Sequence, residues 1–154
     1  MTREVIGFAM VMLVFAIAVL IAVGYRRKSK AETNSVAPLM EAVDCSGVEC
    51  MYVSTVYAES PLRRLLAHGM GPRGRASVAV TDEGISVCRN GERDYLIPKA
   101  QIQSVGKSSA TIDRAVEPGG LVSIEWSHQG IGLITNLRFS DSESRKIFEG
   151  KVLA

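Results

Sequence analysis

The sequence is poor in the residues that most often carry catalysis or bind metals. It has two histidines, three cysteines and one tryptophan among 154 residues. Its formal net charge is only +2, from 18 basic and 16 acidic side chains, an excess too small to indicate a nucleic-acid-binding protein. With 47% hydrophobic and 22% charged residues the chain is not disordered, and its length suits one domain with a short appendage.

One long apolar run lies near the N-terminus. Val5 to Val23 holds 19 residues without a charged or polar side chain, and a helix of that length spans roughly the hydrocarbon core of a bilayer. Tyr25 follows where an interfacial aromatic residue is expected. A cleaved signal peptide explains the run less well, because its apolar region is usually only about 7–15 residues long. We therefore predict a transmembrane helix within residues 1–25.

Four basic residues directly follow the run and indicate its orientation. Basic residues next to a span stay on the cytoplasmic side, and this cluster consists of Arg26, Arg27, Lys28 and Lys30. The sequence therefore predicts a single-pass protein of the cell membrane, with its N-terminus outside and everything after Lys30 in the cytoplasm.

Residues 26–49 read as a linker that is first basic and then acidic. Asn34, Ser35 and Pro38 should interrupt any long helix, although Leu39 to Val43 could form one helical turn. The stretch is expected to be a flexible tether for a folded domain over residues 50–154.

The three cysteines are expected to be reduced in the cytoplasm. The reverse topology would instead make a disulfide between Cys45 and Cys50 plausible. Together with His68, the three cysteines Cys45, Cys50 and Cys88 supply four metal ligands in number only, without the close pairs of a zinc site. No metal or other cofactor is predicted.

Short alternating segments separated by turns dominate the rest of the chain. Asn90-Gly91 is a strong hairpin signal, and Val122, Ile124 and Trp126 alternate with polar residues. Six or seven strands are expected from eight candidate segments, of which 101–105 and 110–116 are the weaker. The candidates are 50–57, 76–81, 85–87, 94–97, 101–105, 110–116, 121–127 and 133–139.

The chain ends in a predicted helix. Ser140 and Glu143 fit a capping box, and Ile147, Phe148 and Val152 then form one apolar stripe. Strands closed at one end by such a helix form the pleckstrin-homology (PH) architecture. The predicted fold is mainly β: a PH-like seven-stranded antiparallel barrel or sandwich capped by a C-terminal helix.

Several short motifs, in their order along the chain, strengthen this interpretation. They are Leu62-Arg63-Arg64, Ala67-His68-Gly69, Tyr95-Leu96-Ile97-Pro98, Ile112-Asp113-Arg114, Glu117-Pro118-Gly119-Gly120-Leu121 and Glu125-Trp126. With these motifs the sequence resembles a family of small bacterial membrane proteins with one N-terminal span and a cytosolic PH-like domain. Some members of that family are labelled transporter or export protein, and the resemblance implies a fold more than an activity.

The stretch from Pro61 to Arg75 is the strongest candidate for a binding site. It contains no acidic residue, and its glycines allow exposed backbone N–H groups, which suits a phosphate or an anionic head group. The alternatives are a partner-protein surface or a solvated loop anchored to the barrel by its leucines, with His68 at the end of a short helix over residues 61–67. The predicted binding residues are Arg63, Arg64, His68, Arg73 and Arg75.

No constellation in the sequence fits an active site. Gly106-Lys107-Ser108 lacks the first glycine of a P-loop, and His128 is expected to be exposed in a turn. The sequence therefore predicts a non-catalytic, membrane-anchored binding or scaffold module with a protein partner at the inner membrane face, and anionic lipid as a further possible ligand. The alternative is an accessory subunit of a membrane transport or export system.

Overall fold

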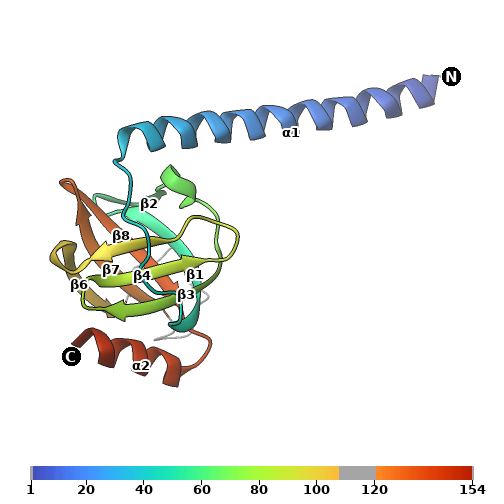
Figure 1. Cartoon of the computed structure of the whole chain (residues 1–154). Coiled ribbons are helices and arrows are strands. Elements are labelled where there is room, and N and C mark those ends of the chain that lie inside the picture. Colours follow the sequence, from blue (N-terminus) through green and yellow to red (C-terminus); the bar gives the residue numbers. More distant parts are fainter. Residues whose placement is uncertain (1, 108–120, 154) are drawn as a thin grey trace.

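The computed structural model describes residues 2–107 and 121–153 of the chain. In these ranges a long N-terminal helix precedes eight strands and a C-terminal helix (Figure 1). The elements are α1 (Thr2–Ser35), β1 (Val48–Tyr57), β2 (Ser60–Arg64), η1 (Ala67–Gly69), β3 (Gly74–Thr81), β4 (Gly84–Arg89), β5 (Tyr95–Pro98), η2 (Lys99–Gln101), β6 (Ile102–Lys107), β7 (Leu121–His128), β8 (Ile131–Arg138) and α2 (Ser142–Leu153).

Helix α1 carries the predicted span and extends well beyond the sheet (Figure 1). The apolar side chains from Val5 to Val23 are exposed, and the stretch from Glu4 to Ser35 is long and apolar enough to cross a membrane. The helix does not end with the apolar run. It continues through the four basic residues to Ser35, whose hydroxyl donates to the carbonyl of Glu32 at 2.9 Å.

All strands in the described part of the chain pair antiparallel in one sheet. The order is β5-β4-β3-β1-β8-β7-β6, with β2 paired to β1 beside this path. The predicted class, an antiparallel β domain with a C-terminal helix, is confirmed. Among the described residues the strands number eight where seven were predicted, because residues 60–64 form β2. The sheet does not close into a barrel, since its edge strands β5 and β6 do not pair.

The β2 region differs most from the sequence prediction. Residues 60–64 form a strand of a hairpin with β1, in place of the predicted helix over residues 61–67. The remaining predicted strands within the described ranges overlap β1 and β3–β8. The predicted strand at 110–116 and the turn at Pro118-Gly119-Gly120 lie outside the described residues.

Side chains that alternate along the strands form the core. Trp126 is fully buried, its indole N–H donates to the Thr135 hydroxyl at 3.0 Å, and its ring stacks on Tyr95 at 6.4 Å. Val122 and Ile124 point to the same interior, as their spacing predicts, whereas Glu125 is exposed.

Asp141 caps α2, in place of the predicted Ser140. Its carboxylate accepts hydrogen bonds from the Ser144 backbone N–H at 2.7 Å and the Ser144 hydroxyl at 2.8 Å. These bonds, the backbone one first, lower the pKa of Asp141 because they stabilise the ionised carboxylate.

Phe148 and the partly buried Val152 attach α2 to the core of the sheet. Phe148 is buried against Phe139, with ring centroids 5.4 Å apart. Ile147 is 47% exposed, so the predicted apolar stripe is wrong at that position. The helix covers the side of the domain opposite to α1 (Figure 1).

The segment 36–47 connects α1 to β1, and we call it the strap. Val36 is buried in the core, and the strap crosses the sheet in extended form, without the predicted helical turn at Leu39 to Val43. The predicted tether is therefore bonded to the domain along its length. Leu96 N donates to Met40 O at 2.8 Å, Val43 N to Ser86 Oγ at 3.2 Å, and Ser77 Oγ to Cys45 O at 2.9 Å.

Candidate functional site

The structure distributes the predicted binding residues over several elements. Arg63 and Arg64 end β2, His68 lies in η1, and Arg73 and Arg75 flank the start of β3. Arg64 and His68 are half-buried, and the other three are exposed. The group thus has one part beneath the end of α1 and another at the start of β3, and its binding role remains a prediction.

The last turns of α1 contact residues 65–71, and we call this contact the joint. Glu32 is at its centre, only 6% exposed. One of its carboxylate oxygens accepts a hydrogen bond from Leu66 N at 2.7 Å, and the other lies 3.5 Å from the guanidinium of Arg63. Arg63 also stacks over the ring of Tyr57 at 4.6 Å, so this arginine is already engaged within the protein.

Further hydrogen bonds fix the joint on both sides of Glu32. The Ser29 hydroxyl donates to Leu66 O at 2.9 Å, and His68 N donates to the Thr33 hydroxyl at 3.2 Å. A side chain on Gly71 would collide with the Tyr25 hydroxyl, so Tyr25 lies directly against that glycine. The joint therefore extends from Tyr25 to the end of the helix.

Both histidines of the protein hold the carbonyls that follow α1. His68 Nε2 lies 2.9 Å from Val36 O, and His128 Nε2 lies 3.1 Å from Ala37 O. His128 is the last residue of β7 and is buried, because the strap lies against it, so the prediction of an exposed histidine in a turn is wrong. His68 has a left-handed backbone (φ 52°), which aims its ring at the end of α1.

Arg89, which was not among the predicted site residues, holds the loop of residues 69–72 that belongs to the joint. It is 6% exposed and donates to Gly69 O at 2.8 Å and to Pro72 O at 2.7 Å. Its guanidinium lies 4.0 Å above the ring of Tyr52. An arginine at the end of a strand usually reaches solvent, so the sequence did not predict a buried one here. In the structure every residue of β4, Arg89 included, is buried.

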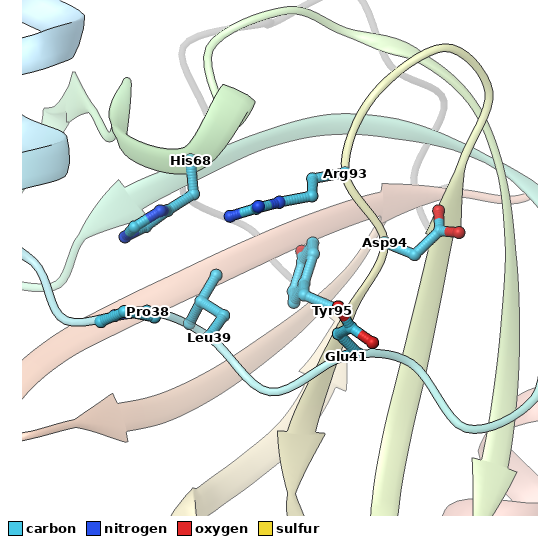
Figure 2. A pocket seen from close by; sticks show the side chains of 7 residues that line it. All are labelled: Pro38, Leu39, Glu41, His68, Arg93, Asp94 and Tyr95. Atoms are coloured by element: carbon cyan, nitrogen blue, oxygen red, sulfur yellow. The ribbon is translucent and has the colours of Figure 1, made fainter.

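A small cavity of about 220 Å³ lies between the strap and the β4–β5 hairpin. Figure 2 shows Arg93 pointing toward His68, with the strap residues Pro38 and Leu39 along the near side. Glu41, Asp94 and Tyr95 complete the lining. The cavity holds both signs of charge, which gives it no clear preference for an anion.

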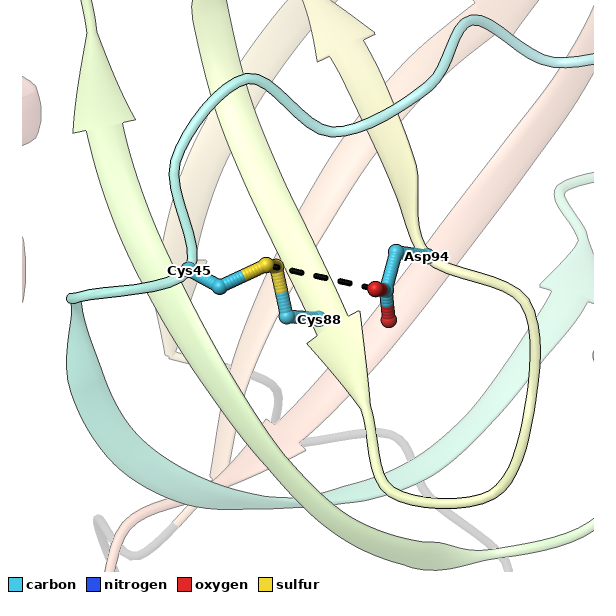
Figure 3. Close-up of side chains that lie close together, drawn as sticks. All are labelled: Cys45, Cys88 and Asp94. Atoms are coloured by element: carbon cyan, nitrogen blue, oxygen red, sulfur yellow. Dashed lines mark hydrogen bonds between the residues drawn. A yellow bond between two sulfur atoms is a disulfide. The ribbon is translucent and has the colours of Figure 1, made fainter.

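Cys45 and Cys88 form a disulfide (Figure 3). The prediction of reduced thiols is therefore wrong for these two residues, and the pairing is not the Cys45–Cys50 bond considered for the reverse topology. Cys50 remains a free thiol because β1 turns it into the interior. Burial raises the pKa of Cys50 to about 12.

The sulfur atoms have an acidic neighbour. Asp94 Oδ2 lies 3.9 Å from Cys45 Sγ, and these two cysteines and Asp94 form a compact group of potential metal ligands in the described part of the chain. Neither Cys50 nor His68 belongs to that group, so the four ligands weighed from the sequence do not come together. While the sulfurs are bonded to each other, they are not available as thiolate ligands.

Residues 30–151 match the model of a protein family that is described as Bacterial PH domain-like. The match covers most of the chain, and the protein belongs to this family. No curated protein matches the chain. PH-like domains are generally non-catalytic, and membership of the family points to a binding or scaffold module.

Proposed function

We propose that this protein is a non-catalytic binding or scaffold module, anchored by a single transmembrane helix at the cytoplasmic face of the cell membrane. Its N-terminus lies outside. Its ligands are a protein partner at the membrane face and the anionic head groups of the lipids. The observation that carries the proposal is the joint, which connects the apolar helix rigidly to the PH-like domain.

The joint supports a domain held close to the bilayer. Tyr25 lies two residues beyond the apolar run, a rise of about 3 Å along a helix, and it touches Gly71. If the apolar run spans the hydrocarbon core, the loop of Gly71 to Arg73 lies at the level of the head groups. Arg73 would then interact with anionic lipid together with the basic cluster at the end of the span.

The cytoplasmic placement rests on that cluster. Arg26, Arg27, Lys28 and Lys30 are exposed on α1, directly after the apolar run. Protease added to intact spheroplasts should leave residues 50–154 uncut, whereas lysed spheroplasts should show digestion. Digestion from outside would overturn the placement.

A second experiment tests lipid contact in the full-length protein. In nanodiscs of anionic lipid, amide hydrogens of residues 70–75 should exchange more slowly than in neutral discs, and added salt should remove the difference. Changing Arg73 and Arg75 to Glu should also remove it. Lys146→Glu is the matched control, because α2 lies on the opposite side of the domain from α1 (Figure 1). Equal exchange in both kinds of disc would refute lipid contact at this loop.

The role of the span itself separates this proposal from an accessory subunit. Replacing residues 5–23 by polyleucine preserves a simple anchor, so partners recovered from mild detergent extracts should be unchanged. Loss of those partners, with the protein still in the membrane, would favour a span that packs against other helices in a transport or export system.

A further inference from the structure

The Cys45–Cys88 disulfide fastens the strap to β4. Cys45 lies near the end of the strap, Cys88 lies on β4, and 43 positions separate them in the sequence. The strap is also the connection between the membrane helix and the first strand. The state of this bond therefore decides how firmly that connection is held to the sheet.

The two sulfur atoms differ in their access to solvent. Cys45 is exposed, whereas Cys88 is only 8% exposed. Both border an open groove of about 720 Å³, which Arg75 and Arg89 also line. An external thiol or disulfide thus reaches Cys45 first. Glu49 and Asp94 line the same groove and offset the two arginines, so the lining favours neither sign of charge.

The surroundings also suit the reduced state. Asp94 Oδ2 lies 3.9 Å from Cys45 Sγ (Figure 3), and the backbone carbonyl of Asp44 lies 3.6 Å from Cys88 Sγ. On reduction the two sulfur atoms must move apart by rotation of the side chains, and each thiol has one of these oxygens nearby as an acceptor for its hydrogen. The site therefore accommodates both a disulfide and a pair of thiols.

We propose that Cys45 and Cys88 are a reversible redox site that exchanges with a low-molecular-mass thiol and its disulfide. The inference rests on the proposed cytoplasmic placement, because disulfides that form in the cytosol of ordinary cells are mostly transient and redox-responsive. Oxidation fastens the strap, and reduction releases it from β4.

The exchange proceeds in two balanced steps. The Cys45 thiolate attacks the external disulfide, forming a mixed disulfide at Cys45 and expelling one thiolate. The Cys88 thiolate then attacks Cys45 Sγ, forming the internal bond and expelling the second thiolate. The two protons lost by the cysteines end on the two expelled thiols, and the external disulfide is the oxidant that is reduced.

The test uses the full-length protein in nanodiscs, with reduced and oxidised glutathione as the probe. Excess reduced probe should open the bond while Trp126 fluorescence remains that of the folded domain, and oxidised probe should restore the bond. Amide exchange of residues 38–47 should become at least about tenfold faster on reduction. A bond that resists reduction in the folded protein, or strap exchange that does not change, would overturn the inference.

Single-cysteine variants test the order of attack. Cys88→Ser should accumulate a mixed disulfide with the probe at Cys45, and Cys45→Ser should accumulate far less at the buried Cys88. Cys50→Ser is the matched control and should leave the cycling of the other pair intact. Preferential labelling of Cys88 would contradict the proposed order.

Trapping the thiols in acid-quenched cells separates this inference from the proposed function. A pair that is reduced at rest and oxidised after treatment with diamide, in a domain protected from external protease, supports both. A protected domain whose pair never changes state overturns the redox site alone. A permanently oxidised pair in a domain that is digested from outside overturns the cytoplasmic placement as well.

Discussion

Substitution of Glu32 by alanine gives the most direct test of the joint. The substitution removes the acceptor of the Leu66 N–H, a bond of 2.7 Å made by a side chain that is 6% exposed. A hydrogen bond to a charged group contributes about 1.5–3 kcal/mol. The contact with Arg63 adds less than about 1 kcal/mol, because that side chain is 56% exposed and water screens it. The joint should therefore lose roughly 2 kcal/mol, or about 30-fold in its closing equilibrium.

Hydrogen exchange of residues 65–70 in the full-length protein in nanodiscs measures this loss. Exchange there should accelerate by roughly 30-fold in Glu32→Ala and by less in Glu32→Gln, which keeps an oxygen acceptor but loses the charge. Asn34→Ala is the control, because Asn34 is exposed on the same helical turn. If Glu32→Ala exchanged no faster than Asn34→Ala, the joint would not depend on the buried carboxylate, and the account of a rigidly held domain would fail.

Three further predictions concern the stability of the domain, which fluorescence of the single tryptophan, the buried Trp126, reports during denaturation. Reduction of the disulfide, or Cys45→Ser, should lower the free energy of unfolding by up to about 4 kcal/mol, because the bond joins residues 43 positions apart. An unchanged denaturation midpoint would contradict the structural role of the bond. Phe148→Ala should cost about 3–5 kcal/mol, whereas Ile147→Ala, at an exposed position, should cost less than about 1 kcal/mol; equal losses would refute the packing of α2. The pKa of Cys50 rises from 9.0 to about 12 on folding, so the folded state binds more protons than the unfolded state above pH 9. The free energy of unfolding should therefore fall there by up to about 1.4 kcal/mol per pH unit, and Cys50→Ala should flatten that part of the profile.

The patterns that predicted the fold correctly are local ones. An uninterrupted apolar run is sufficient for α1, and two-residue alternation is sufficient for most of the sheet, as at Val122, Ile124 and Trp126. β2 was missed because Pro61 and two arginines within five residues resemble a turn or a short helix more than a strand. Its pairing depends on the neighbouring β1, and no periodicity within β2 itself indicates it.

The joint and the disulfide could not be predicted because their partners are distant in the sequence. Glu32 is 34 residues from Leu66, and in the sequence it is one acid of an electrically neutral linker. Cys45 is five residues from Cys50, a spacing that favours a local pair, but the strap passes over β4 and brings the Cα atom of Cys45 to 5.5 Å from that of Cys88. The fold class was therefore readable from the chain, whereas the attachment of the domain was not.

The scarce residues of this chain serve that attachment. Both histidines bond the carbonyls that follow α1, two of the three cysteines fasten the strap, and the buried Glu32 holds the loop that the helix contacts. Here their hydrogen bonds and covalent bond fix the direction in which a PH-like sheet extends from its helix. If its ligands lie at a membrane face, as proposed above, a fixed orientation keeps the binding surface aligned with them and lowers the entropy lost on binding.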